Sequence, residues 1–332
     1  GRRAVAEHLQ RQDIDAVVFS REVPGCYGAR FLLGRKPLVS ILIPNRDQPD
    51  MLARCMRALA RSTYQPLEIL IIENGSKEPQ THELYATWQA QGRCRVLNWD
   101  KPFHFAAMNN FAAAEARGEF LLLLNNDVEA LNADWLEFMV GYARQPAIGA
   151  VGAKLLFPDG RLQHGGLVLG LNGSAGHIGH GHFPDDPNLN LRMTFARNCA
   201  AVTGACLLVR KAVFEEVGGL HEQFPFDFND TDFCLKLLDR GYRNVWTPDA
   251  CLLHHESKSR GNSMSPKKRA RYRRDTGAFL AKWQQRIRAG DPYFSPHYRL
   301  DQPIYVLRVD KRAKDETANF ANIEQAKEPE RS

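Results

Sequence analysis

A carboxylate and two amides end an apolar run, and side chains of these types can bind a ligand. The run is LLLLNNDV at residues 121–128, and it contains no glycine or proline to turn the chain. A short, continuous apolar run predicts a buried strand. Polar groups at the carboxyl end of such a strand lie where open α/β sheets bind ligands. Asp127 is therefore a candidate for chemistry, although Asn and Asp also favour ordinary turns at strand ends.

Two earlier runs are predicted to end in polar groups in the same way. PNRD at residues 44–47 follows an apolar run at 39–43, and ENG at 73–75 follows a run at 67–72. Because ligands bind beyond the carboxyl ends of parallel strands, three polar strand ends would converge on one edge of a sheet. One polar strand end indicates a turn, whereas three in succession indicate a site.

Acidic residues precede a predicted helix later in the chain. NDTD at residues 229–232 comes before apolar residues at helical spacing and after an aromatic-rich approach at 224–228. The helix macrodipole favours carboxylates in the first turn. One acid there would be an ordinary cap, but two acids around a threonine favour an active site. A later strand, 251–253, is followed by His254 and His255.

A Gly- and His-rich stretch, residues 165–181, contains or adjoins four histidines. His164, His177, His180 and His182 fit no zinc-ligand spacing. We therefore expect a flexible loop here rather than a metal site.

Alternating strands and helices must position these groups. Strands are predicted at 39–43, 67–72, 119–124, 148–157 and 206–209, and helices at 51–59, 80–91, 105–117, 135–140 and 211–217. We expect Asp50 and Asn132 to cap two of the helices and Gly118 to end a third. Strands and helices alternating at short intervals indicate an α/β fold, with a mostly parallel central sheet flanked by helices.

Composition is that of a soluble globular protein. The chain has 332 residues, 44% hydrophobic and 25% charged, and no apolar run approaches the ~18 residues of a membrane span. The start has no signal-peptide pattern and no initiator Met, so we expect a fragment of something longer. The seven cysteines form no CxxC pair and indicate reduced thiols in the cytoplasm.

The net charge of +6 is concentrated late in the chain. Residues 257–274 contain eight Lys or Arg and no acid. A solvated loop is the ordinary explanation of such a run, and a diphosphate, acidic lipid headgroups or nucleic acid are the alternative partners. Because neither aromatic interleaving nor a nucleic-acid motif occurs, we expect no nucleic-acid partner.

Six segments of the sequence, taken in order, carry a resemblance to a known family. They are PLVSILIPNRD (37–47), EILIIENGS (68–76), FAAMNNFAAAEARGEFLLLLNND (105–127), VTGACLLVRKAVFEEVGGL (202–220), FNDTDFCLKLLDRGYRNVWTP (228–248) and LLHHESKSRG (252–261). Together they resemble bacterial family 2 glycosyltransferases of the GT-A fold, over residues 37 to about 262. The chain looks most like the subgroup that adds sugars, often deoxyhexoses such as rhamnose, to cell-surface polysaccharides. The resemblance implies an inverting enzyme that moves a sugar from a UDP- or dTDP-sugar to a hydroxyl of a glycan or lipid-linked acceptor.

The resemblance also implies a divalent metal, Mn²⁺ or Mg²⁺. The family has Asp-any-Asp where this chain has residues 125–127, so Asp127 would anchor the metal against the donor diphosphate. His254 or His255 would complete the ligands, and we prefer His254 because it follows Leu253 directly. An imidazole ligand favours Mn²⁺ over Mg²⁺.

Asp230 matches the family's catalytic base, which takes the proton from the acceptor hydroxyl. Asn229 stands where the family commonly has Glu. Asp232 would hold either the helix start or the acceptor. In Thr203, Gly204 and Ala205, small side chains would let a sugar approach the backbone.

The donor nucleotide would lie across the first strand ends. The implied donor-binding residues are Pro44, Arg46, Asp47, Glu73, Asn74, Asn109, Asn125, Asn126 and Asp127. Glu73 replaces the usual Asp and can accept a hydrogen bond from the base or the ribose. Lys258 and Arg260 would close over the diphosphate as part of a lid.

The domain assignment and two rival functions complete the interpretation. We expect a tail of a preceding domain (1–36), a glycosyltransferase domain (37–262, with a nucleotide-sugar half 37–145 and an acceptor half 146–262), a helical cap (263–310) and a disordered tail (311–332). The enzyme would act in the cytoplasm, in peripheral contact with the inner membrane. Other domains of a longer chain would be its partners. A nucleotidyltransferase is one rival, but residues 44–49 lack its Gly-rich phosphate loop. An inactive module that binds sugar nucleotides or glycans is the other.

Overall fold

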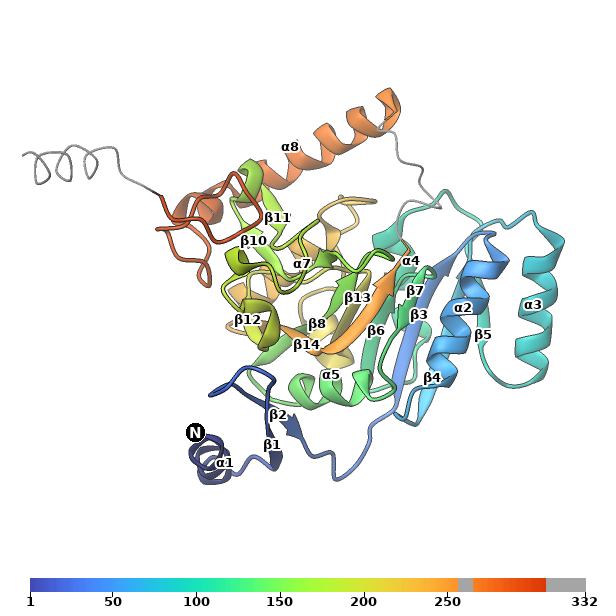
Figure 1. Cartoon of the computed structure of the whole chain (residues 1–332). Helices are drawn as coiled ribbons and strands as arrows, with labels where there is room; N and C mark the ends of the chain where they lie inside the picture. Colours follow the sequence, from blue (N-terminus) through green and yellow to red (C-terminus); the bar gives the residue numbers. More distant parts are fainter. Residues whose placement is uncertain (256–264, 309–332) are drawn as a thin grey trace, which may run out of the picture.

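A ten-stranded sheet runs through the protein and carries helices on both faces (Figure 1). This computed structural model describes residues 1–255 and 265–308. The strands of the sheet are β3 (Val39–Asn45), β4 (Leu67–Glu73), β5 (Arg95–Asn98), β6 (Phe120–Leu124), β7 (Val128–Ala130), β8 (Ile148–Leu156), β9 (Leu162–His164), β12 (Arg197–Cys199), β13 (Cys206–Arg210) and β14 (Arg243–His254). Their order is β12-β14-β8-β13-β6-β3-β4-β5, with β7 beside β14 and β9 beside β8.

The first half of the sheet is parallel, as the sequence predicts. β3 pairs in parallel with β4 and β6, and β4 pairs in parallel with β5. The second half is mixed, because β13 runs antiparallel to both β6 and β8 while β14 is parallel to β8. The two predicted halves of the domain therefore share one continuous sheet, and the α/β fold class is confirmed.

Helices follow the strands. They are α2 (Pro49–Ala60), α3 (Pro79–Ala90), α4 (Phe105–Glu115), α5 (Trp135–Ala143), α6 (Lys211–Glu216), α7 (Asn229–Asp239) and α8 (Pro266–Ala289), with 3₁₀ turns η1 (Leu171–Gly173), η2 (Pro187–Leu189) and η3 (Arg192–Thr194).

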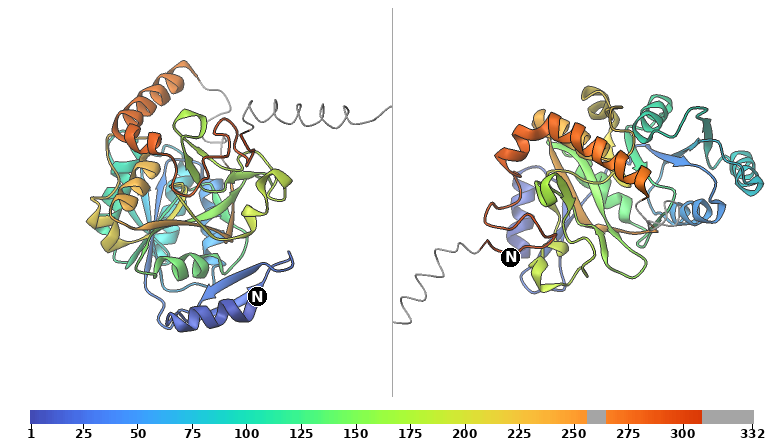
Figure 2. Two further views of the ribbon diagram at one scale, coloured as in Figure 1. Left: turned by 90° about the vertical axis from the view of Figure 1, so that its left-hand side faces the viewer. Right: turned by 90° about the horizontal axis from the view of Figure 1, so that it is seen from above.

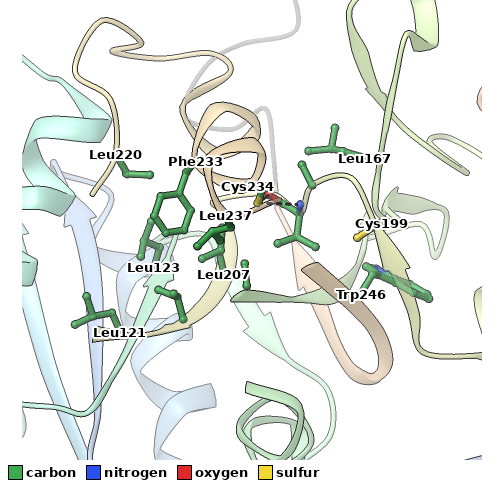
Figure 3. Close-up of a cluster of buried hydrophobic side chains, with 14 of the residues drawn as sticks. Leu121, Leu123, Leu167, Cys199, Leu207, Leu220, Phe233, Cys234, Leu237 and Trp246 are labelled. Atoms are coloured by element: carbon green, nitrogen blue, oxygen red, sulfur yellow. Dashed lines mark hydrogen bonds between the residues drawn. The ribbon is translucent and has the colours of Figure 1, made fainter. Parts of the chain in front are cut away.

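The central strand β6 is apolar throughout because both of its faces are covered. Leu121 and Leu123 belong to the core that also contains α4, α6 and α7, whereas Leu122 and Leu124 belong to the core with α2, α3 and α5. Figure 3 shows Phe233 of α7 and Leu123 of β6 among the side chains of the first of these cores. This alternation follows from the two-residue period of a strand, and it explains why a strand buried on both faces is a continuous apolar run.

Two predicted helix caps are wrong. α2 begins at Pro49 after Gln48, and Asp50 lies inside its first turn. Proline suits the first helical position because it has a fixed φ and no N–H to satisfy. Asn132 does not cap α5, which begins after Asp134. The Asn132 amide instead donates to the Asp249 carbonyl at 2.8 Å and accepts from the Cys251 N–H at 3.1 Å, tying this loop to β14.

Gly118 does not end the preceding helix, contrary to our prediction. α4 ends at Glu115, and Ala116 is already extended. A Cβ at Gly118 would lie 2.6 Å from the Ser40 backbone nitrogen. The glycine is therefore needed for the close approach of this loop to β3.

The prediction of a flexible loop at residues 165–181 is also wrong. The stretch forms an antiparallel hairpin of β10 (Leu167–Leu169) and β11 (Ala175–His177), closed by η1. The side chains of Leu167, Val168, Leu171 and Ile178 are buried in the main core, which fixes the hairpin against the sheet.

The N-terminal segment packs on the domain. It consists of α1 (Arg2–Arg11) and a hairpin of β1 (Ala16–Ser20) and β2 (Tyr27–Phe31). The Arg21 guanidinium makes two hydrogen bonds, of 2.6 and 2.8 Å, to the carboxylate of Asp249 in β14. The rings of Phe31 and Tyr142 meet edge to face at 4.9 Å. The assignment of residues 1–36 as the tail of a preceding domain stays a prediction.

α8 crosses the second half of the domain, on the opposite side from α1, β1 and β2 (Figure 2). Residues 291–308 follow it and pack by an aromatic cluster of Phe294, Tyr298 and Tyr305. The assignment of residues 263–310 as a helical cap stays a prediction. Within residues 1–255 and 265–308, no helix is both long enough and apolar enough to cross a bilayer. The predicted lid residues Lys258 and Arg260, and the predicted disordered tail, lie outside the described residues.

Candidate active site

The three polar strand ends meet, as the sequence predicts. Asn126, after β6, donates its amide N–H to the Asn45 side-chain oxygen at 2.6 Å, at the end of β3. The Asp47 N–H donates to the Ser76 hydroxyl at 2.8 Å, beyond the end of β4. Because β6, β3 and β4 are neighbours in the sheet, these hydrogen bonds join their ends into one edge.

The turn after β3 has an unusual backbone. Asp47 and Gln48 have φ of 53° and 58°, in the left-handed region that few non-glycine residues adopt. The Asp47 carboxylate accepts from the N–H groups of Lys77 and Glu78 at 2.6 and 2.9 Å. The hydrogen bond from Glu78 is the main cause that lowers the pKa of Asp47, so this carboxylate is ionised at neutral pH. Arg46 beside it has an exposed side chain.

A cavity of about 600 Å³ opens at this edge. Its lining includes most of the sequence-predicted residues, namely Pro44, Arg46, Asp47, Asn125, Asn126, Asp127, Thr203, Gly204, Ala205, Asn229, Asp230 and His254. Volumes of this order are typical of small-molecule and cofactor sites.

Three residues that were predicted to bind the sugar donor do not line the cavity. Their side chains form hydrogen bonds within the segments around it. The buried Glu73 carboxylate accepts from the Ser76 hydroxyl at 2.7 Å and from the Tyr85 hydroxyl at 2.6 Å. Asn74 donates to two backbone carbonyls, at 3.0 and 2.8 Å. Asn109 is fully buried and donates to the Phe105 carbonyl at 2.9 Å. These contacts hold in place the segments that form the cavity wall.

Asp127 and His254 come together from distant strands. The Asp127 Oδ1 atom lies 3.2 Å from Nε2 of His254, and both side chains are more than nine-tenths buried. The Asn125 amide lies 3.3 Å from the same nitrogen. His255 faces away from this pair, with its Nε2 3.6 Å from the Glu129 carboxylate, and it does not line the cavity.

The pair fits a hard divalent cation that is bound together with a diphosphate. Adjacent ligands of an octahedral ion at about 2.1 Å lie roughly 3 Å apart, close to the separation of these two side chains. Among the described residues, no group of three or more His, Cys, Asp or Glu could hold a metal. Further ligands would therefore be diphosphate oxygens and water, an arrangement that Mg²⁺ commonly adopts.

Asp230 is held at the start of α7 by backbone donors. Its Oδ1 accepts from the Thr231 N–H at 2.7 Å, and its Oδ2 accepts from the Gly204 N–H at 2.9 Å. A Cβ at Gly204 would lie 3.2 Å from the Phe105 ring, so the missing side chain keeps this contact close. The residue before the helix, Phe228, has a φ of 64°, a strained conformation of the kind found at functional sites.

Asp232 lies outside the cavity, so the structure places it as a support and not as an acceptor ligand. Its carboxylate is fully buried and lies 2.6 Å from the Lys282 ammonium, and it accepts from the Trp283 indole N–H at 2.8 Å. Lys282 and Trp283 belong to α8, so this carboxylate ties α8 to the helix that carries Asp230.

An aromatic wall on one side of the cavity was not predicted from the sequence. The wall consists of Phe103, Phe226, Phe228 and Tyr272. Phe103 stacks on Phe226 with centroids 5.6 Å apart, and the Arg271 guanidinium lies 3.9 Å from the Phe226 centroid. The aromatic residues at 224–228 could have indicated this wall from the sequence. Tyr272 lies in a basic run, and nothing in that run indicates an aromatic contact with the cavity.

Comparisons with known families match most of the chain. The sequence profile described as Glycosyl transferase family 2 matches residues 40–218, and a second, Glycosyl transferase family group 2, matches residues 162–300. The first match covers more than half of the chain and therefore establishes the family.

Two similar relatives are much longer proteins. An uncharacterized protein of Sinorhizobium fredii, y4gI, is 42% identical over 92% of this chain. The O-antigen biosynthesis protein RfbC of Myxococcus xanthus is 40% identical over 90%. The chain spans 34% of the first protein's length and 23% of the second's. The N-acetylglucosaminyl-diphospho-decaprenol L-rhamnosyltransferase of Mycobacterium tuberculosis is 26% identical over 69% of this chain and 80% of its own length.

Solved structures with the same fold are glycosyltransferases. A mannosyltransferase of Pyrobaculum calidifontis, solved with GDP-Man and Mn²⁺, is 14% identical with a TM-score of 0.51, over 87% of this chain and 81% of its own. GalNAc-T7, solved with UDP, GalNAc and Mn²⁺, is 12% identical with a TM-score of 0.56, over 78% of this chain and 59% of its own. The GT-A architecture expected from the sequence is thus confirmed, and this chain belongs to glycosyl transferase family 2.

Proposed function

We propose that this chain transfers a sugar from a nucleotide-diphosphate donor to a hydroxyl of a glycan or lipid-linked acceptor, with inversion at the anomeric carbon. One observation carries the proposal: Asp127, His254 and Asp230 line a single cavity at the carboxyl edge of the parallel strands. A diphosphate site and a general base within one cavity are what a single displacement requires.

The residues in the donor half of the cavity would orient the nucleotide-sugar donor. Asp47 offers an ionised carboxylate and Arg46 an exposed guanidinium beside the turn after β3. Asn125 and Asn126 present amides at the end of β6, where the diphosphate would lie. A divalent ion held by Asp127 and His254, with Mn²⁺ preferred over Mg²⁺, would supply charge neutralisation at the leaving diphosphate.

Asp230 acts on the acceptor. As the acceptor oxygen forms its bond to the anomeric carbon, the bond from that carbon to the diphosphate oxygen breaks, and the nucleoside diphosphate leaves with the electron pair. The hydroxyl proton moves to Asp230. Oδ2 has one donor among the described residues, the Gly204 N–H, so it keeps a lone pair for this proton. The backbone donors also fix the direction in which the carboxylate faces.

The names of the relatives support the kind of product. The O-antigen biosynthesis protein and the rhamnosyltransferase among the relatives support polysaccharide synthesis and a deoxyhexose donor. A UDP- or dTDP-sugar is the donor that we propose on this basis. The location in the cytoplasm, the peripheral contact with the inner membrane and the cooperation with further domains stay predictions.

Substitution of the base tests this proposal against a binding module that lacks activity. Asp230→Asn should lower the rate of donor turnover by roughly 10²- to 10⁴-fold, the usual contribution of general acid–base catalysis, while nucleotide affinity stays within twofold. The matched control is Asp239→Asn at the other end of α7, where the carboxylate pairs with Arg286 outside the cavity. Wild-type protein that binds nucleotide and turns over no donor would identify the chain as a binding module.

A further inference from the structure

Two histidines that play no part in the proposed chemistry form a hydrogen-bonded pair at the cavity. His164 ends β9 and His177 ends β11, and their Nδ1 atoms lie 2.9 Å apart. The rings meet edge to face, with centroids 4.9 Å apart. His164 is fully buried, whereas His177 is partly accessible and lines the cavity.

The hydrogen bonds fix which nitrogen of each ring carries the proton. The Thr203 N–H donates to Nε2 of His164 at 3.4 Å, so Nε2 is an acceptor and the proton of a neutral ring lies on Nδ1. That Nδ1–H donates to Nδ1 of His177, which must then be an acceptor. The proton of His177 is therefore on Nε2. The opposite tautomers would set an N–H of His164 against the N–H of Thr203.

Both rings are neutral near pH 7, so the hydrogen bond keeps its direction from His164 to His177. Burial lowers the pKa of His164 well below its usual value, and the neighbouring His177 lowers it further. Burial, followed by the charges of His180 and His254, lowers the pKa of His177 to about 3, and a contact with the Gln163 backbone opposes this only in part. A neutral pair has one proton between the two Nδ1 atoms, as the hydrogen bond requires.

The series of hydrogen-bond donors, from the Thr203 N–H through His164 to His177, starts beside the proposed base and ends in the cavity. Thr203, its first member, precedes Gly204, whose N–H holds Asp230. The His177 ring hydrogen-bonds to His164 through Nδ1, and the Gln163 backbone is its other recorded hydrogen-bonding contact among the described residues, so a ligand oxygen would compete with that backbone for Nε2–H. His177 lines the same cavity as Asp230 and His254, so it borders the space in which a sugar would be placed for transfer.

We infer that His177 is a sugar-recognition residue whose Nε2–H donates to an oxygen of a saccharide bound in the cavity, and that His164 is the positioning residue that holds it in this role. The inference rests on the proposed function. The partner is an oxygen with a free lone pair, either a hydroxyl or the carbonyl of an acetamido group. A deoxy position has no such lone pair and would not be recognised. The saccharide is either the donor's sugar or the acceptor's, and the two sources can be separated by experiment.

Two substitutions of His177 test the recognition. His177→Phe keeps a ring of similar size without a donor, and His177→Asn retains an N–H donor. The control is His182→Asn, in the same His-rich region, where the ring pairs with Asp186 at 2.8 Å outside the cavity. Each variant is titrated with UDP and dTDP and with the matching nucleotide sugars in the presence of Mn²⁺, and its donor hydrolysis and its transfer to simple methyl glycosides are measured.

We expect His177→Phe to bind the nucleoside diphosphate within twofold of wild type. If His177 recognises the donor, the additional affinity conferred by the donor's sugar falls by roughly 10- to 100-fold, the cost of an unpaired polar group. If it recognises the acceptor, hydrolysis is unchanged and the acceptor KM rises by a similar factor. His177→Asn should recover part of either loss, and His164→Phe should reproduce the loss more weakly, with kcat less affected than KM.

Sugar affinity, hydrolysis and acceptor KM that are all unchanged in His177→Phe would overturn the inference and leave the proposed function intact. Wild-type protein that binds neither nucleotide nor nucleotide sugar would overturn both. A loss that His177→Asn shares in full, with a lowered melting temperature in both variants, would assign the pair a structural role only.

Discussion

Asp127 and His254 lie 3.2 Å apart although Asp127 follows β6 and His254 ends β14, and these two strands are not neighbours in the sheet. β7 brings them together, because it follows Asp127 directly and pairs antiparallel with the end of β14, with His254 opposite Val128. The backbone of the next residue completes the junction, since the His255 N–H donates to the Asp127 carbonyl at 2.9 Å. The pair is thus a product of strand pairing, which holds both side chains at one point of the cavity.

Removing either member of this pair should weaken metal-dependent nucleotide binding. Asp127→Asn and His254→Gln should each lower the affinity for a nucleoside diphosphate in the presence of Mn²⁺ by roughly 10- to 100-fold, with a smaller effect when the metal is absent. Calorimetric titration measures both. His255→Gln is the control, because that ring faces Glu129. Equal losses in the control and in His254→Gln would contradict the assignment.

The amide at position 125 offers a gain-of-binding test. Asn125→Asp would place a second carboxylate beside His254, where the amide now lies 3.3 Å from Nε2. Hard divalent cations prefer carboxylate oxygens, so we expect tighter Mn²⁺-dependent nucleotide binding, by about 3- to 10-fold. A lower affinity would indicate that the amide itself is needed by the donor.

The strand ends were predictable from the sequence because their signal is local. An apolar run that stops at polar residues gave Asn125–Asp127 and the turn at 44–47, and the parallel order placed them together. Contacts between distant segments gave no such signal. The pair of His164 and His177 depends on how β9 and the hairpin of β10 and β11 pack together, and the burial of Asp232 depends on where α8 lies. Local signals also misplaced helix starts, because Pro49 set the start of α2 more strongly than the acid after it.

Asp232 should contribute to stability more than to nucleotide binding. Asp232→Ala removes a fully buried carboxylate and leaves the Lys282 ammonium and the Trp283 N–H without their partner. We expect a loss of about 2–4 kcal/mol in the free energy of unfolding, measured by urea denaturation. Trp283→Phe should cost less, because it removes one neutral donor. A loss below about 0.5 kcal/mol for Asp232→Ala would show that α8 does not depend on this contact.

Stability should fall as the pH drops below about 6.5, in part because of the buried histidine pair. The unfolded chain protonates His164 and His177 near the usual pKa of about 6.5, whereas burial lowers the pKa of both in the folded state. The unfolded state therefore binds more protons in this window, and each histidine costs about 1.4 kcal/mol of folding free energy per pH unit below it. Urea titrations at several pH values should show a shallower slope in His177→Asn than in wild type. Identical slopes would contradict the burial of the pair.

Two glycines give opposite expectations for the same substitution. Gly118→Ala would place a Cβ 2.6 Å from the Ser40 backbone nitrogen, and we expect a loss of about 1–3 kcal/mol. Gly277 lies in the exposed middle of α8, and apart from its chain neighbours and its own helix backbone, no atom of the described residues lies within 4 Å of the point that a Cβ would occupy. Gly277→Ala should raise stability by about 0.5–1 kcal/mol, because alanine favours a helix. Urea denaturation of both variants checks the pair, and a destabilised Gly277→Ala would contradict the placement of this helix.

Calorimetric titration of the wild-type protein with UDP and with dTDP, each with and without Mn²⁺, tests the central claim most directly. The proposed donor site predicts that one nucleotide binds tightly and that this binding requires the metal. Binding of neither nucleotide in the presence of Mn²⁺ would leave the fold and the family in place and contradict the assignment of the cavity as a nucleotide-sugar site.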